Sequence, residues 1–259
     1  MALLNAARGD ARAPALWVGR DIEKRVLYRD GLILVVDKPA GLPVHAGTGG
    51  GENLEMHFTR LRFGLPRDPA LAHRLDRDTS GCLVLGRHRK ALAKLGRLFA
   101  QGKVEKTYWA VVAGAPTADE GLIDAPLEKK NAKWGWQMRV SADGQPAKTA
   151  WRVRGRAEDV AWLECRPLTG RTHQLRVHLD HIGHPIVGDS LYGPGAKGWA
   201  LHLHARALSI PLYPKREAIG VKAPVPPHMH ELLARCGWRR EDANGTKDAA
   251  RTPEESHDV

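Results

Sequence analysis

Short apolar runs separated by turn residues limit what this chain can fold into. Residues 26–28 and 32–37 flank Asp30-Gly31, a dipeptide that favours a tight hairpin turn between two strands. Residues 105–112 are rich in aromatic and β-branched residues and predict a central strand. Residues 200–208 alternate apolar and polar residues like a half-buried strand, and further strands are predicted at 82–86, 149–154 and 160–166. This predominance of short strands favours an α+β fold over the regular alternation of strand and helix that builds a parallel sheet.

Only a few segments have helical periodicity. In residues 89–101, Leu92, Leu95 and Phe99 recur at helical spacing and Gly102 follows as a natural stop. Residues 172–181 predict an amphipathic helix that ends at Gly183. We therefore expect a mostly antiparallel mixed sheet with flanking helices. The ordered domain should span residues 26–238, between a loose lead-in (1–25) and a polar, disordered tail (239–259).

The charge of the chain indicates a polyanionic partner. Forty Lys and Arg against 29 acidic residues give a net charge of +11, which favours nucleic acid over the alternative of a merely Arg-rich composition. Three dispersed cysteines indicate a reducing compartment. The N-terminus is not patterned as a signal peptide, and no apolar run approaches the roughly 20 residues of a membrane span. We expect a cytoplasmic protein, monomeric by default.

The densest polar cluster is the segment His73-Arg-Leu-Asp-Arg-Asp-Thr-Ser-Gly81, directly before an apolar strand. A loop of this kind on a rigid element is typical of an active site. A solvated turn, capped by Asp78 and Thr79, is the alternative, and composition alone leaves both open. An aspartic protease is disfavoured because it needs a second matching aspartate loop, which the sequence lacks.

A second polar cluster, residues 168–178, begins the later helix. His173, Arg176 and Asp180 share one helical face, and Arg171 with the backbone N–H groups there is suited to phosphate. An ordinary amphipathic helix with an exposed basic face explains the same pattern. These residues alone favour that simpler interpretation.

Together the clusters resemble a known family. His73 to Gly81 and Thr169-Gly-Arg-Thr-His-Gln-Leu-Arg-Val-His178 are similar to motifs of the RluA family of RNA pseudouridine synthases. Three further segments agree with it in the same order: Tyr28 to His45 with Asp37-Lys-Pro, Lys106-Thr-Tyr-Trp-Ala-Val-Val-Ala-Gly114, and His184-Pro-Ile-Val-Gly-Asp189 with Leu191-Tyr-Gly193. The resemblance covers residues 28 to 208 and implies the pseudouridine synthase catalytic fold.

The resemblance also implies roles for individual residues. Asp76 would be the catalytic carboxylate, with Arg176, or failing that Arg171, as the nearby cation that keeps it ionised. Tyr108 would stack on the uracil, although a core aromatic residue is the alternative. The implied catalytic set is Asp76, Tyr108 and Arg176, and the implied substrate-binding set is Arg74, Arg77, Arg171, His173 and Leu175. Arg74 would fill the gap left by the extruded base, and Arg77 would track phosphates.

The function implied is isomerisation of a specific uridine, in tRNA or large-subunit rRNA, after base flipping and without cofactor or metal. The rivals are an inactive RNA-binding protein and a glycosidic hydrolase. The hydrolase would need two carboxylates facing each other, and this sequence offers only Asp76 and Asp78 in one loop.

The histidines at 178, 181, 184, 202 and 204 have no cysteine or acid at typical metal-ligand spacing. Trp134 and Trp136, amid lysines, fit either RNA stacking or a hairpin.

Overall fold

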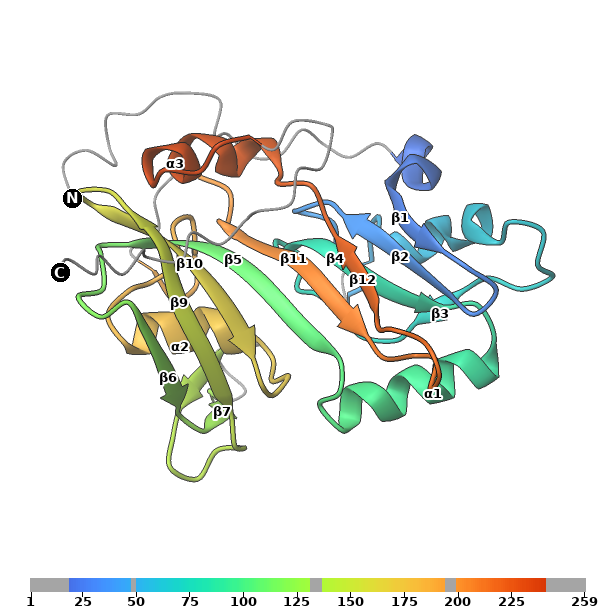
Figure 1. Cartoon of the computed structure of the whole chain (residues 1–259), viewed down its shortest axis with the longest axis horizontal. Coiled ribbons are helices and arrows are strands. Elements are labelled where there is room, and N and C mark those ends of the chain that lie inside the picture. The colour runs from blue at the N-terminus through green and yellow to red at the C-terminus, as the bar shows by residue number, and fades with distance from the viewer. Residues whose placement is uncertain (1–18, 48–49, 131–136, 194–198, 241–259) are drawn as a thin grey trace, which may run out of the picture.

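The fold is organised around one large mixed sheet (Figure 1). The computed structural model describes residues 19–47, 50–130, 137–193 and 199–240. Its 10-stranded sheet has the order β1-β2-β4-β11-β5-β10-β9-β6, with β3 beside β4 and β12 beside β11. All pairings in this sheet are antiparallel except that of β4 with β11. This arrangement confirms the predicted α+β class.

The strands and helices have the following bounds. The strands are β1 (Val26–Arg29), β2 (Ile33–Lys38), β3 (Ala70–Leu71), β4 (Ser80–Gly86), β5 (Glu105–Ala113), β6 (Glu120–Asp124), β7 (Leu127–Lys129), β8 (Met138–Val140), β9 (Lys148–Arg156), β10 (Val160–Pro167), β11 (Leu203–Ile210) and β12 (Ile219–Lys222). The helices are α1 (Arg89–Ala100), α2 (Gln174–His181) and α3 (His230–Arg235), with 3-10 turns η2 (Gly19–Arg25), η3 (Leu54–Leu61) and η5 (Pro227–Met229).

The predicted strands and the two predicted helices are present, with ends that move by a few residues. The prediction of a loose lead-in is wrong for residues 19–25, which form η2. The cause is Ile22, fully buried in the cluster that also contains Leu34 and Leu61. Residues 1–18, the tail beyond 240, and Trp134 and Trp136 lie outside the described residues.

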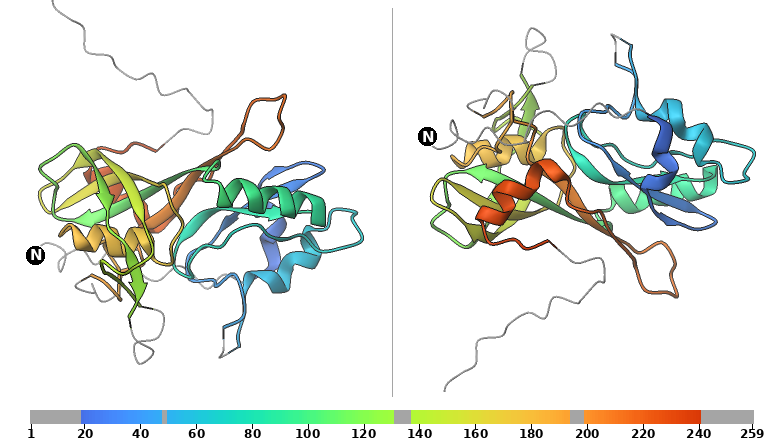
Figure 2. Two further views of the ribbon diagram at one scale, coloured as in Figure 1. Left: turned by 90° about the horizontal axis from the view of Figure 1, so that it is seen from below. Right: turned by 90° about the horizontal axis from the view of Figure 1, so that it is seen from above.

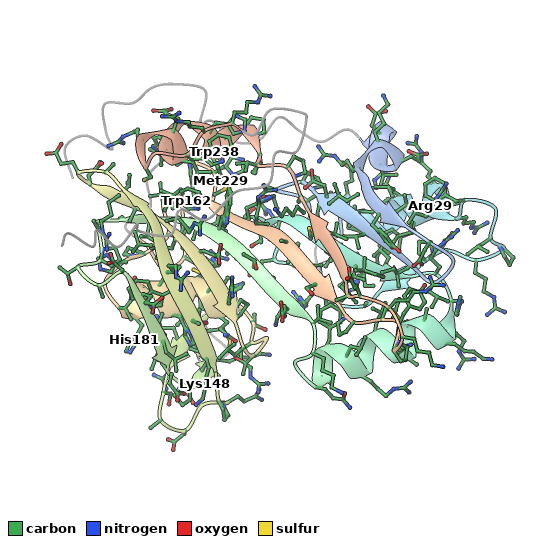
Figure 3. The ribbon with its side chains drawn as sticks, viewed as in Figure 1. Arg29, Lys148, Trp162, His181, Met229 and Trp238 are labelled. Carbon is green, nitrogen blue, oxygen red and sulfur yellow. The ribbon has the colours of Figure 1, made fainter. Side chains whose placement is uncertain are left out.

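The β5–β10 half of the sheet is covered on both faces. On one face Leu175 and Leu179 of α2 pack against alternate strand residues such as Ala110. On the other face α3 covers Trp162 of β10, beside Met229 and Trp238, all three labelled in Figure 3. Figure 2 shows α2 and α3 on opposite sides of these strands. Burial on both faces makes this half a rigid platform.

The β2–β4 half is covered in the same way by different elements. Leu95 of α1 packs into the cluster of Val84, whereas the neighbouring Leu83 faces the cluster built by η3. Tyr108 of β5 is half-buried and contacts the η3 cluster as well as the α2 cluster. The two halves of the molecule therefore meet at Tyr108.

The predicted exposed basic face of α2 is absent from the fold. Gln174, Leu175, Arg176, Val177, His178 and Leu179 are all buried. Val177 faces a small cluster with Leu127 of β7, to which Met138 of β8 and Tyr192 add. The sequence pattern failed here because partners distant in the sequence cover the polar side chains of the helix. Arg176 pairs with Asp189, and His178 lies within hydrogen-bond distance of Thr149 and of the Ala125 carbonyl oxygen.

Candidate active site

A cleft of about 510 Å³ opens where the two halves of the sheet meet. Its walls come from the loop before β4, from β5, from the segment that leads into α2, and from the end of α1. The cleft gathers most of the residues that the sequence singled out, namely Arg74, Asp76, Tyr108, Arg171, His173, Leu175 and Arg176. Arg77 is not among the lining residues; it is exposed, with Nε 3.3 Å from Asp78 Oδ1.

The Asp76 loop is fixed from behind by a buried lysine. Lys38 Nζ donates to the carbonyl oxygens of Pro39, Leu42 and Arg77 at 2.8, 2.8 and 2.9 Å. Burial lowers the pKa of Lys38 to about 7, although nearby aspartates oppose the shift. Because the Arg77 carbonyl directly follows Asp76, these hydrogen bonds fix the backbone that presents the carboxylate.

The strand after this loop depends on a glycine. Gly81, in β4, has a φ of 106°, and a Cβ there would lie 2.3 Å from the Ala205 carbonyl oxygen of β11. Any other residue would push β4 away from β11. Gly81 thus allows the single parallel pairing of the sheet, immediately beyond the Asp76 loop.

Asp76 lies close to a histidine and not in a direct ion pair with an arginine. His173 Nε2 is 4.0 Å from Asp76 Oδ1. Within the described part of the chain, neither Arg176 nor Arg171 forms an ion pair with Asp76. Arg171 Nε instead donates to the Pro146 carbonyl at 3.0 Å.

Arg176 is held by Asp189 in a bidentate pair. Its Nε and Nη2 donate to the two carboxylate oxygens at 2.7 and 2.6 Å, and both side chains are buried. Burial alone would lower the pKa of Arg176, but Asp189, with a smaller contribution from Asp76, raises it. Arg176 is therefore a fixed positive charge near Asp76, but its hydrogen bonds are made to Asp189 and not to Asp76.

Asp189 and Tyr192 are site residues that the sequence reasoning missed. Asp189 also accepts from the backbone N–H groups of Leu191 and Tyr192, at 2.9 and 3.1 Å. Tyr192 Oη in turn lies 2.7 Å from His173 Nδ1 and accepts from Met138 N. An aspartate within an otherwise apolar and glycine-containing stretch was the available signal, because a buried carboxylate requires a partner.

His173 is held in an unusual backbone conformation at the entrance of α2. Its φ is 52°, in the left-handed region that non-glycine residues seldom occupy. Burial lowers its pKa, opposed by Asp76. A neutral ring that accepts from Tyr192 Oη carries its proton on Nε2, which faces the Asp76 carboxylate.

Tyr108 presents its ring to the cleft from the middle of the sheet. Its strand neighbours are Ala205 of β11 and Cys165 of β10. Burial, and then the charge of Asp76, raise the pKa of the phenol. Tyr108 is consequently a neutral hydroxyl and a rigid aromatic surface next to the carboxylate.

A buried hydrogen-bond network anchors α2 to β9. Gln174 Nε2 donates to Thr149 Oγ1 at 3.0 Å, and Thr149 Oγ1 lies 2.9 Å from His178 Nδ1. His178 Nε2 lies 2.9 Å from the Ala125 carbonyl oxygen. Burial lowers the pKa of His178, so the neutral ring accepts from Thr149 and donates to Ala125.

Neither a metal site nor a membrane span occurs in the described residues. No group of three or more His, Cys, Asp and Glu side chains there could hold a metal ion. No helix in the same residues is long and apolar enough to cross a bilayer. The cleft chemistry that these residues offer is a carboxylate, a phenol, an imidazole and arginines.

Comparisons with known proteins identify the family of this chain. The family model described as RNA pseudouridylate synthase matches residues 32–181. An uncharacterized RNA pseudouridine synthase of Zymomonas mobilis is 42% identical over 215 residues, which are 82% of this chain and 98% of that protein. The ribosomal large subunit pseudouridine synthase D of Xanthomonas campestris is 39% identical, over 90% of this chain and 74% of its own length. The structure of human RNA pseudouridylate synthase domain containing 4 has a TM-score of 0.72 at 28% identity, covering 85% of this chain and 95% of that one.

The fold, the cleft and these matches define an enzyme class, the RNA pseudouridine synthases, which are isomerases that act on RNA. Within that class the chain belongs to the RluA family.

Proposed function

We propose that the chain isomerises one uridine of large-subunit rRNA, with Asp76 as its catalytic carboxylate. The observation that carries the proposal is the convergence of Asp76, Tyr108 and Arg176 on one cleft, although they are far apart in the sequence. The rRNA target rests on the Xanthomonas relative, whose name specifies the large ribosomal subunit. A tRNA stem-loop is the second candidate substrate, favoured by nothing specific in the structure.

The cleft is suited to a base taken out of its stack. Enzymes that act on a base within structured RNA extrude it, because the reacting atoms are otherwise inaccessible. Tyr108 offers a ring for stacking on the uracil, and Leu175 an apolar contact. Arg74 is exposed and lines the cleft, which supports the proposal that it enters the vacated stack.

The proposed chemistry conserves atoms and electrons. The bond from uracil N1 to ribose C1′ breaks, the ring turns, and a bond from C5 to C1′ forms. The C5 proton leaves and N1 gains a proton, so no oxidant, reductant or water is consumed. Asp76 must be ionised both for attack on the sugar and for action at the 2′ position, and Arg176, buried in its pair with Asp189, is the proposed cation near it. The Tyr108 hydroxyl is proposed to accept the proton that leaves C5 and to donate its own proton, which accounts for the proton gained at N1.

The hydrolase rival lacks the second carboxylate that it needs. Asp78 does not line the cleft and lies beside Arg77 at its outer side. A glycosidase requires two carboxyl groups facing each other across the substrate. Asp76 has no such counterpart among the cleft residues that the structure describes.

The proposal is tested by tritium release from RNA labelled at uridine C5. Fragments that tile large-subunit rRNA, and a set of tRNA transcripts, are incubated with wild type, Asp76→Asn and Asp78→Asn. Release from one rRNA fragment by wild type and Asp78→Asn, but not by Asp76→Asn, is the expected result. Release from tRNA alone would show that the substrate is tRNA and not large-subunit rRNA. Release by Asp76→Asn would show that Asp76 is not the catalytic carboxylate.

A further inference from the structure

The exposed face of α1 has a composition that packing within the fold does not explain. Ala93, Gly96 and Ala100 follow one another at helical spacing and are all exposed. The residues that pack inward are Ala91 and Leu95, on the opposite side of the helix. These three residues have no side chain longer than a methyl group, so another surface can approach the helix backbone closely along this stripe, between the longer side chains that flank it.

Gly96 is the most telling residue of this face. A glycine inside a helix costs about 1 kcal/mol relative to alanine. A Cβ added at Gly96 would meet nothing within 4 Å, and the residue has no left-handed φ. The described fold gives no reason for glycine at this position, since neither a close neighbour nor a turn requires it.

Exposed cationic side chains flank this stripe of small residues. Arg89, Lys90, Arg97 and Lys103 are exposed, and α1 contains no acidic residue. Arg89 and Lys90 lie at the helix N-terminus, where the helix dipole disfavours positive charge. In the part of the chain that the structure describes, none of these four forms an ion pair. Figure 3 shows nitrogen-tipped side chains extending from α1 away from the sheet.

Cations elsewhere on the surface are arranged differently. On β9, Arg152 pairs with Glu120 and Arg156 with Asp119, at 2.9 and 2.8 Å. Lys148, on the same strand, pairs with Asp124 at 2.7 Å. Three of the four cations of β9 are thus paired, with Arg154 as the exception, whereas the four cations named on and beside α1 are available to an external anion.

The α1 face continues directly into the cleft. Phe99, Ala100 and Gly102 line the cleft and belong to, or follow, the last turn of α1. At about 1.5 Å per residue, a helix of this length extends roughly 18 Å away from the cleft rim, so it is long enough to contact several successive phosphates of an RNA strand.

We propose that the α1 face, defined as Arg89, Lys90, Ala93, Gly96, Arg97 and Ala100 with the adjoining Lys103, binds the RNA strand next to the extruded uridine. The cations hold its phosphates, and the small residues let the strand lie against the helix. This inference rests on the proposed function for the identity of the RNA, but the phosphate contacts themselves need no chemistry at Asp76. An acidic protein is the other occupant that such charge would admit, and the test separates the two.

The first experiment measures binding of poly(U) over a KCl series from 50 to 200 mM. The variant Arg97→Gln/Lys103→Gln is compared with Arg152→Gln/Arg156→Gln, which removes the same formal charge from the paired β9 surface. Each lost contact with a single strand lowers the salt slope by about 0.7. We expect the α1 variant to lose about 1.4 from the slope and roughly tenfold in affinity at low salt, and the β9 variant to match wild type.

Several outcomes decide between the proposals. An unchanged slope in the α1 variant, or an equal loss in the β9 variant, overturns the α1 surface. A reduced slope together with no C5 tritium release from any RNA leaves the surface in place and removes the proposed reaction. Tritium release by wild type, together with an unaltered salt slope in the α1 variant, supports the proposed reaction and overturns the α1 surface. Poly(U) that fails to bind wild type at 50 mM KCl excludes RNA and leaves the acidic protein.

The second experiment separates close approach from charge. Gly96→Gln adds a neutral side chain to the stripe of small residues and should raise the melting temperature, because glutamine is a good helix former. It should nevertheless weaken poly(U) binding severalfold, whereas Gly96→Ala should bind as wild type does. A Gly96→Gln variant that binds as tightly as wild type would show that no strand lies against the helix there.

Discussion

The helices α1 and α2 both border the cleft, but they meet their surroundings in opposite ways. Most residues of α2 are buried, and its polar side chains have partners inside the protein, such as Asp189 for Arg176 and Thr149 for His178. In α1, by contrast, only Ala91 and Leu95 are buried, and its outer cations have no acidic partner in the described residues. The difference teaches that polarity in a helix has two uses: internal polar groups fix a site, and external ones receive a ligand.

The largest effect is expected from a mutation that removes the partner of a buried α2 residue. Asp189→Ala leaves the buried charge of Arg176 without its partner, which costs about 3–5 kcal/mol of folding free energy. We expect a loss of that size in urea unfolding, and loss of RNA-dependent activity even where the variant folds. Replacing both partners, as Arg176→Met/Asp189→Leu, should restore much of the stability but none of the activity. A single mutant as stable as wild type would contradict the role of the pair.

A smaller effect is expected from the anchor between α2 and β9. Thr149→Val removes a hydroxyl that serves both Gln174 and His178, and leaves buried polar atoms without partners, at about 1–3 kcal/mol. Thr107→Val in β5, a half-buried threonine without such contacts in the described residues, is the control and should change little. Urea unfolding measures both. Equal effects would mean that shape and not hydrogen bonding matters at Thr149.

On the α1 side the expected effect has the opposite sign. Gly96→Ala should increase the free energy of unfolding by about 0.5–1 kcal/mol, because it lowers the entropy of the unfolded chain and meets open space. Gly81→Ala, by comparison, would strike the Ala205 carbonyl and destabilise the protein. Calorimetry on the two variants therefore distinguishes a glycine that the fold needs from one that it does not.

The smallest effect concerns acid, and it too should distinguish the helices. Burial holds the pKa of His178 below its ordinary value, so the unfolded chain takes up this proton first as pH falls. The stability of α2 is therefore fully present above about pH 6.5 and decreases below it. Amide hydrogen exchange, corrected for its intrinsic pH dependence, should show α2 losing protection between pH 7 and 5 more than α1. Parallel loss in both helices would contradict this assignment.

Sequence alone predicted those elements whose pattern is local and long enough. The turn at Asp30-Gly31 and the period of Leu92, Leu95 and Phe99 produced β1, β2 and α1 with nearly correct ends. The segments β3, β6, β7, β8, β12 and α3 were not predicted, since such short segments leave no measurable period and no turn signal like Asp30-Gly31 was recognised beside them. Their formation depends on neighbours distant in the sequence, such as the pairing of β6 with β9.

The sequence predicted which residues form the candidate site better than it predicted the hydrogen bonds and ion pairs among them. Arg74, Asp76, Tyr108 and His173 gather at one cleft as expected. The catalytic roles of Asp76 and Tyr108 and the substrate-binding roles of Arg74 and His173 remain predictions. The pairing of Arg176 with Asp189 was not foreseen, because no periodicity brings a loop after a helix back onto that helix. The burial of Lys38 behind the Asp76 loop was likewise not foreseen.

The pairing of β4 with β11 has a consequence for how the enzyme comes into being. Ser80 and its hydrogen-bond partner His204 are 124 residues apart in the chain. During synthesis the Asp76 loop therefore leaves the ribosome long before the strand that frames it, and contacts so distant in sequence form late and slowly. A nascent or truncated chain that ends before β11 would have the Asp76 loop without the strand that frames it. Maturation of activity should thus coincide with completion of the chain.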